Sequence, residues 1–181
     1  VNAMALRVPA RTLVDPTGGV EDLVAQRLRT PAEAAISFGD DPLRMLRAAR
    51  FSAQLGFDVD AATVAAMTEL RRTLSIVSPE RIQGELVRLL QSRDPVRGIR
   101  LLVETGLMGE FLPEIPALRL EVDEHHHHKD VYEHSLTVLR QAIELEEARH
   151  PGAAPDVALR LAALLHDIGK PATRRLEPGG G

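Results

Sequence analysis

Four side chains that could bind a polar ligand recur at every third position of one segment. They are Asp41, Arg44, Arg47 and Arg50. On a helix, residues three apart differ by about 60° around the axis, so these side chains would form a slanted polar ridge. A hydrogen-bond-accepting carboxylate would then adjoin planar, permanently charged donors. The same spacing is typical of a capped amphipathic helix whose arginines face water, and spacing alone favours this simpler interpretation.

Two histidines and an aspartate offer a second kind of chemistry. His134 stands apart from the adjacent pair His166 and Asp167. Imidazole and carboxylate groups are suited to a divalent transition metal. Alternatively, His134 lies on a solvated helix face and Asp167 only ends a helix. Residues 125–128 are four histidines between charged neighbours; we interpret them as a polar connector and as weak evidence for a metal site.

The segments that must position these side chains have a mostly helical pattern. Residues 1–14 alternate loosely and are broken by Pro9, which predicts a hairpin. Residues 15–19 combine Asp, Pro, Thr and two glycines, a set that favours a turn. Beyond Gly19, apolar residues recur at spacings of three and four, which indicates helices.

Capping signals fix the ends of two of these helices. Ser78 followed by Pro79 predicts one helix start. Asp94 predicts another, and that helix should run to about Glu104 and stop before Gly106.

A proline-punctuated stretch over residues 112–116 predicts a domain junction near Leu118. After it we expect a long helix over residues 130–147 and an apolar helix over residues 156–166.

Composition sets broader limits. The chain has 181 residues, of which 44% are hydrophobic but only 3% aromatic, so its core must be aliphatic, which favours packed helices. Because cysteine is absent, disulfides, thiolate nucleophiles and cysteine-type zinc sites are excluded, which fits a cytoplasmic protein. The net charge of −4 argues against overall attraction to nucleic acid but leaves local basic surfaces possible. We expect no membrane association and interpret both chain ends as cuts within a longer protein.

Three ordered motifs resemble those of a known enzyme family. They are Asp15, Gly18, Gly19 and Asp22, then DDPLRMLRAARF, then SPERIQGELVRLL. Their order and separation are similar to those of the class II tRNA nucleotidyltransferases, which include CCA-adding enzymes and poly(A) polymerases. The opening VNAMAL also resembles the segment that comes after the signature of that family's catalytic head. The resemblance covers nearly the whole chain.

This resemblance implies roles for the first two motifs. Asp41 and Arg44 would read the Watson–Crick edge of the incoming nucleotide, and Arg47 and Arg50 would hold its base or triphosphate. The segment with Asp15, Gly18 and Gly19 would be a flexible loop that helps the site switch between nucleotides. In the third motif, Arg81 and Glu85 stand four residues apart, so they could pair with each other, and we interpret them as structural.

The segments VYEHSLTVL and LAALLHDIGKPATR resemble the first half of an HD domain, a helical metal-dependent phosphohydrolase fold. The resemblance implies that His134, His166 and Asp167 are metal ligands, that further ligands lie beyond Gly181, and that Lys170 contacts phosphate.

Together these observations predict a mainly α fold. Residues 1–22 would be the end of a nucleotidyltransferase head, 23–118 a helical neck and body, and 119–181 half of an HD domain. The parent enzyme would add CMP and AMP from CTP and ATP to the 3′ end of tRNA. Its Mg²⁺ ligands would lie outside this chain, which holds no residue catalytic for transfer.

Three alternatives stay open at this point. The first is an HD-type phosphohydrolase, acting as a phosphatase or a 2′,3′-cyclic phosphodiesterase. The second is a helical RNA-binding module whose arginines contact only phosphate. The third is a poly(A) polymerase, because the arginine ridge does not reveal whether CTP is refused.

Overall fold

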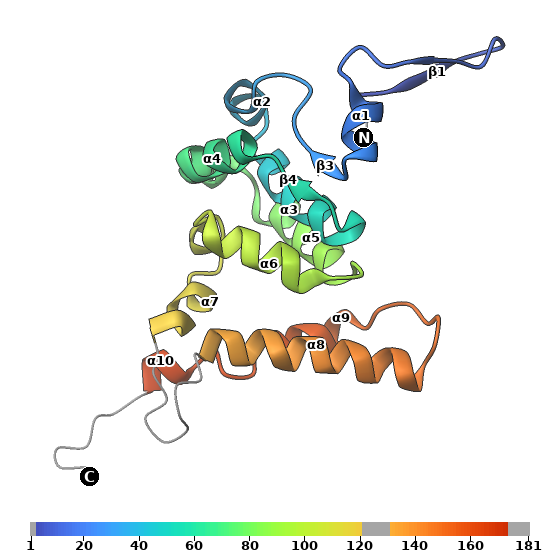
Figure 1. Ribbon diagram of the computed structural model, residues 1–181. Coiled ribbons are helices and arrows are strands. Elements are labelled where there is room, and N and C mark those ends of the chain that lie inside the picture. The colour runs from blue at the N-terminus through green and yellow to red at the C-terminus, as the bar shows by residue number, and fades with distance from the viewer. Residues whose placement is uncertain (1–2, 121–130, 174–181) are drawn as a thin grey trace. The chain divides into compact units, whose positions relative to one another are not determined.

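The computed structural model describes residues 3–120 and 131–173 and confirms the mainly α fold (Figure 1). The chain forms two compact units, Val1–Glu110 and Phe111–Gly181. The predicted domain limits at residues 22 and 118 stay predictions, and the four histidines at 125–128 lie outside the described residues. Within the described part of the chain, no helix has both the length and the apolar composition needed to cross a membrane.

The first unit opens with the predicted hairpin. Strand β1 (Ala5–Arg7) pairs antiparallel with β2 (Thr12–Val14). The segment predicted as a turn leads directly into a short helix, α1 (Gly19–Val24). A parallel pair of two-residue strands, β3 (Arg27–Leu28) and β4 (Asp58–Val59), was not expected, because so short a pair leaves no periodic pattern in the sequence.

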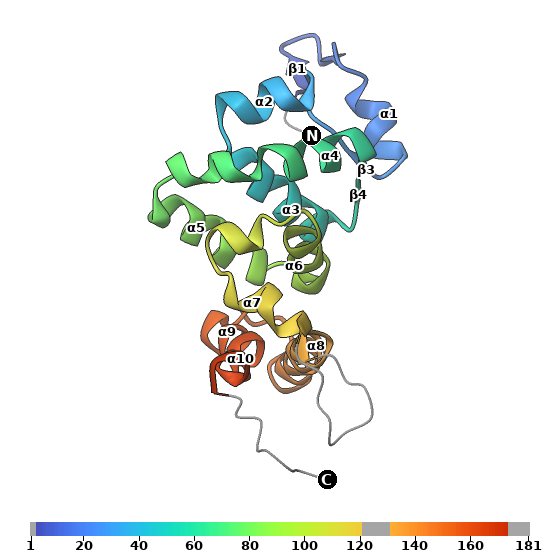
Figure 2. The ribbon, with the colours of Figure 1, turned by 90° about the vertical axis from the view of Figure 1, so that its left-hand side faces the viewer.

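The rest of this unit is helical. Its α-helices after α1 are α2 (Ala34–Asp40), α3 (Leu43–Leu55), α4 (Ala61–Leu70), α5 (Pro79–Leu90) and α6 (Pro95–Glu104). Two 3₁₀ helices, η1 (Arg71–Ile76) and η2 (Met108–Glu110), complete the unit. Helix α3 is central, packing against α5 and α6 (Figure 2), while α2 packs against α4.

Helix α3 buries one face and leaves its arginines on the other. Leu43, Met45, Leu46, Ala49 and Ala53 are each 3% exposed or less. This face joins α3 to α5 and α6, so the polar ridge rests on a firmly packed helix.

Both predicted helix starts are confirmed, but only Asp94 caps its helix through its side chain, because the Ser78 side chain makes no capping hydrogen bond. Helix α5 begins at Pro79, directly after Ser78. Helix α6 begins at Pro95, where the Asp94 carboxylate accepts a hydrogen bond from the backbone N–H of Arg97 at 3.2 Å. It ends at Glu104, and Gly106 adopts a left-handed φ of 77°.

The contact between α3 and α6 depends on Gly98. A Cβ atom at this position would lie 2.9 Å from the carbonyl oxygen of Ala49 and 3.1 Å from the Cβ of Ala53. Because backbone cannot move aside cheaply, we expect Gly98→Ala to lower the free energy of unfolding by about 1–3 kcal/mol, measured by urea denaturation. Gly84→Ala is the matched control, because a Cβ in that helix interior meets nothing within 4 Å. It should leave stability unchanged or raise it by up to about 1 kcal/mol. Equal effects at both positions would contradict the close packing.

The second unit is also helical. It contains α7 (Glu114–Ala117), η3 (Leu118–Leu120), α8 (Val131–Arg149), α9 (Val157–Leu165) and α10 (Lys170–Thr173). Helices α8 and α9 pack along each other (Figure 1). Both match the predicted helices apart from their end residues. Asp156 caps α9 by accepting a hydrogen bond from the backbone N–H of Leu159 at 3.1 Å.

Candidate functional site

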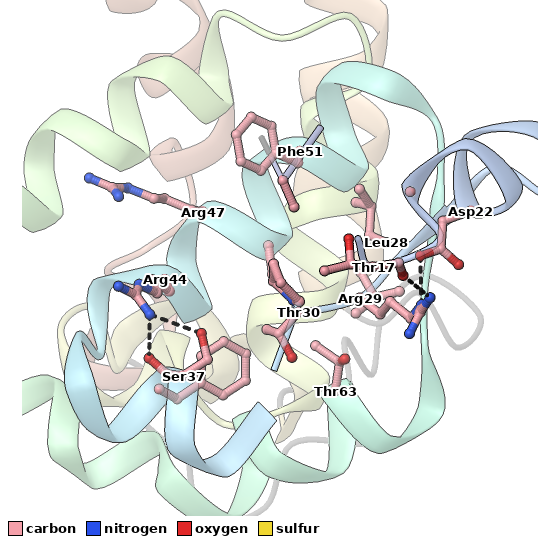
Figure 3. A pocket seen from close by; sticks show the side chains of 16 residues that line it. Thr17, Asp22, Leu28, Arg29, Thr30, Ser37, Arg44, Arg47, Phe51 and Thr63 are labelled. Atoms are coloured by element: carbon pink, nitrogen blue, oxygen red, sulfur yellow. Dashed lines mark hydrogen bonds and ion pairs between the residues drawn. The ribbon is translucent and has the colours of Figure 1, made fainter. Parts of the chain in front are cut away.

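A cavity of about 380 Å³ opens beside α3 in the first unit (Figure 3). Its lining comes from the loop before α1, from β3 and the residues after it, and from α2, α3 and α4. Of the predicted site residues, Gly19, Arg44 and Arg47 line this cavity, whereas Asp41 and Arg50 do not. The structure therefore brings part of the predicted loop and part of the arginine ridge to one cavity.

Asp41 and Arg44 flank the turn between α2 and α3, and each already has partners. The Arg44 guanidinium donates to both the carbonyl oxygen and the hydroxyl of Ser37, each at 3.1 Å (Figure 3). The Asp41 carboxylate accepts from the backbone N–H of Leu43 at 3.3 Å and from the Arg81 guanidinium at 3.2 Å. A ligand base bound between the two would exchange some of these contacts.

Arg47 and Arg50 both meet Glu85, which projects from α5 and is only 3% exposed. Their Nε atoms lie 3.3 Å and 2.7 Å from its carboxylate oxygens. Arg88 adds a third contact at 3.2 Å. Arg50 also donates to Gln54 at 2.7 Å, so its Nε and one Nη atom both donate within the protein.

Arg81 and Glu85, which could have paired with each other, each bind other partners. Arg81 bonds to Asp41, and Glu85 bonds to arginines of α3 and to Arg88. An exposed pair four residues apart contributes only about 0.2–0.5 kcal/mol, whereas a buried carboxylate requires close cationic partners. The sequence does hold a signal for this: Glu85 lies three residues after Ile82 and four before Leu89, on the apolar stripe of α5.

The predicted flexible loop is held by hydrogen bonds at both ends. The Asp15 carboxylate accepts from the backbone N–H groups of Gly19 at 2.7 Å and Val20 at 2.8 Å, and thereby caps α1. Gly18 adopts a left-handed φ of 71°. Arg29 donates to the carbonyl oxygen of Thr17 at 2.7 Å.

Asp22, the second acid of the first motif, is hydrogen-bonded to arginines beside this loop. Asp22 accepts hydrogen bonds from Arg27 at 2.7 Å and from Arg29 at 2.6 Å. Arg29 thus ties Asp22 to the loop that borders the cavity.

The capping of α1 predicts a pH effect. The N–H groups of Val20 and Gly19 stabilise the charged carboxylate and hold the pKa of Asp15 below its ordinary value of 3.8. This stabilisation is therefore complete above pH 3.8 and is lost as the pH falls through the lowered pKa. Carboxyl NMR titration should give a pKa below 3.8, with the Gly19 amide shift following the same curve. In Asp15→Asn that amide titration should vanish, and a pKa at or above 3.8 in the wild type would contradict the cap.

The second unit brings together the three predicted metal ligands. His134 lies on α8, whereas His166 and Asp167 come directly after α9, and one ligand atom from each lies within 4.8 Å of the others. The Asp167 carboxylate is 3.1 Å from His166 Nε2 and 3.9 Å from His134 Nε2. Ligand atoms about 2.1 Å from a shared metal lie about 3.0–3.4 Å apart, so this donor set fits a divalent transition metal after a small adjustment.

Local contacts orient His166 and Asp167. His166 Nδ1 lies 2.9 Å from the carbonyl oxygen of Ala163, which fixes the ring and leaves Nε2 toward Asp167. Partial burial raises the pKa of Asp167, but the hydrogen bond from Lys170 and the potential of His166 outweigh it, so the pKa lies below the ordinary range. The carboxylate is thus available as an anionic ligand.

Two family models match the chain. Residues 56–118 match the family described as a probable RNA and SrmB-binding site of polymerase A. Residues 131–178 match the HD domain.

Curated relatives are similar over nearly the whole chain. The A-adding tRNA nucleotidyltransferase of Deinococcus radiodurans is 40% identical over 186 residues, covering 100% of this chain and 41% of the relative. The multifunctional CCA protein of Pseudomonas aeruginosa is 40% identical over 177 residues, covering 94% of this chain and 40% of the relative. The chain therefore spans about two fifths of the length of the curated relatives it matches.

Solved structures share the fold. The CCA-adding enzyme of Bacillus stearothermophilus in complex with CTP is 27% identical, with a TM-score of 0.63 over 93% of this chain and 42% of that one. A tRNA-processing enzyme with CTP reaches a TM-score of 0.71 over 96% of this chain and 48% of that one; at 21% identity it supports the fold alone.

Proposed function

Because this chain is a homologue of the bacterial CCA-adding tRNA nucleotidyltransferases, we propose that the protein adds CMP and AMP to the 3′ end of tRNA from CTP and ATP. The observation that carries this proposal is the 40% identity to the Pseudomonas multifunctional CCA protein over 94% of this chain. The equal identity to the Deinococcus A-adding enzyme supports the addition of AMP alone. Within that activity, this chain selects the base. It acts in the cytoplasm, where tRNA is processed.

Base selection rests on Asp41 and Arg44. Cytosine and adenine each present an amino donor beside a ring-nitrogen acceptor, so one carboxylate and one guanidinium satisfy both. Uracil and guanine present a carbonyl where the amino group would be. A carbonyl facing Asp41 opposes two acceptors, and a buried unpaired polar group costs about 1–3 kcal/mol.

The cavity beside α3 supports the role of Arg44 in this assignment, whereas Asp41 lies outside the cavity lining. Arg44 and Arg47 line it together with Thr17 and Gly19 of the loop. Arg47 is still 42% exposed beside Glu85, so part of its guanidinium can meet a triphosphate. Arg50 is 13% exposed and held by Glu85, so its contribution is to position Arg47 and the ridge rather than to reach far into the cavity.

The chemistry of transfer needs a divalent ion, which we propose to be Mg²⁺ held by carboxylates in the part of the protein beyond this chain. When bound there, Mg²⁺ activates the tRNA 3′-hydroxyl and neutralises the triphosphate. We therefore expect residues 1–181 alone to lack transferase activity.

The direct test is tRNA extension by the full-length protein. A tRNA ending before CCA should be completed when CTP and ATP are both present. Because the Deinococcus relative is an A-adding enzyme, a second substrate ending in CC should be tested with ATP alone. Extension of only the second substrate would assign A-addition. Long adenosine tails on either substrate would assign poly(A) polymerase activity, and no extension of either would contradict the proposal.

A second activity is favoured by the cluster of His134, His166 and Asp167. With a transition metal bound, this site would supply an activated water for attack on a phosphoester. Metal-dependent hydrolysis of a 2′,3′-cyclic nucleotide, lost in His166→Ala, would support it. If the protein instead only binds RNA, affinity should fall steeply with salt and show no base preference.

A further inference from the structure

Lys170 lies on the side of Asp167 that faces the two histidines. Its Nζ donates to Asp167 Oδ2 at 2.8 Å. The same oxygen is 3.1 Å from His166 Nε2 and 3.9 Å from His134 Nε2. One carboxylate oxygen is therefore the meeting point of a side-chain cation and both imidazoles.

Lys170 places positive charge at this meeting point. Its ammonium lies 2.8 Å from the Asp167 carboxylate oxygen that both imidazoles approach. A divalent ion held by His134, His166 and Asp167 would bring its own positive charge to the same carboxylate, and two cations at one carboxylate oxygen repel each other.

Lys170 can leave this position easily. Lys170 is the first residue of the short helix α10, and its backbone N–H donates to the carbonyl oxygen of Asp167 at 3.0 Å. Its side chain is 50% exposed, and ion pairs at such exposure contribute little to stability. The flexible stem lets the ammonium move into water while the backbone stays in place.

We propose that Lys170 competes with the metal for Asp167. The ammonium neutralises the carboxylate until a divalent ion displaces it, so Lys170 lowers the metal affinity of the site. This inference rests on the proposed metal site at His134, His166 and Asp167.

The test is Mn²⁺ binding to the full-length protein, followed through the electron paramagnetic resonance signal of the free ion. Mn²⁺ is preferable to Ni²⁺ because it is less attracted to a run of histidines such as residues 125–128. Lys170→Met removes the charge at similar length and should tighten binding about 10-fold. Lys170→Gln should act in the same direction and serves as a second variant if Lys170→Met fails to fold.

One control variant keeps the positive charge at position 170, and the other removes a positive charge far from the metal site. Lys170→Arg retains a cation beside Asp167 and should leave the Mn²⁺ affinity close to that of the wild type. Arg149→Met removes a charge at the other end of α8, about 22 Å from His134, and should have no effect.

His166→Ala identifies the Mn²⁺ binding that belongs to this site. If His166→Ala leaves all Mn²⁺ binding unchanged, both the metal site and the competition between Lys170 and the metal are contradicted. If His166→Ala removes a component of binding but neither Lys170→Met nor Lys170→Gln tightens that component, the metal site stands and the competition is overturned.

Discussion

Replacing Glu85 with alanine is expected to lower the free energy of unfolding by about 3–5 kcal/mol, the largest stability effect that we anticipate for a single side chain. Glu85 is 3% exposed and contacts Arg47, Arg50 and Arg88. Its removal would leave the largely buried Arg50 without its counterion and would open a cavity between α3 and α5, whereas Arg47 and Arg88 are exposed enough to be solvated. Urea denaturation of the full-length variant, followed by circular dichroism, measures the change.

The matched control for this prediction is Arg88→Gln. Arg88 is 60% exposed, so the loss of its contact with Glu85 should cost less than about 1 kcal/mol. If Glu85→Ala lowers the free energy of unfolding by no more than Arg88→Gln does, then Glu85 does not stabilise the packing of α3 against α5.

Replacing Arg44 with methionine is expected to lower kcat/KM for both CTP and ATP by about 100-fold. A hydrogen bond from a charged donor contributes about 1.5–3 kcal/mol, and the unpaired ring nitrogen of the base adds a desolvation cost. Arg44 is exposed, lines the cavity and makes its described hydrogen bonds to Ser37, so its loss should leave the core intact. Steady-state incorporation by the full-length protein, with each nucleotide varied separately, measures the effect.

Arg72→Met is the control for charge loss, because Arg72 is an exposed arginine of η1 that does not line the cavity. It should leave kcat/KM within about threefold of the wild type on the same energy scale. Equal losses in both variants would indicate a general effect of charge on tRNA binding rather than base reading.

Local signals in the sequence predicted local structure well. The starts of α5 and α6 follow from Pro79 and Asp94, because a cap and the helix that it begins are neighbours in the chain. The turn at residues 15–19 was also predicted from residues that are adjacent in the chain, although its last residue, Gly19, already belongs to α1. Such local signals do not reveal which residue of another helix a given side chain will contact.

The site residues have their partners on other helices, which these local signals do not reveal. Asp41 bonds to Arg81 and Arg50 bonds to Glu85, across intervals of 40 and 35 residues. Neither contact follows from spacing, because it depends on how α3 packs against α5. The meeting of His134 with His166 was anticipated only through the resemblance to HD domains, since nothing in the spacing of the two requires that they approach.

The central claim is that Asp41 and Arg44 select the base, and calorimetric titration of the full-length protein tests it most directly. CTP, ATP, UTP and GTP would each be titrated in the presence of Mg²⁺ into the wild type and into Asp41→Ala. The wild type should bind CTP and ATP at least about 10-fold more tightly than UTP and GTP, and the variant should lose this preference. Equal binding of all four nucleotides, unchanged by the substitution, would contradict base selection by these residues and leave the arginine ridge a structural feature of α3.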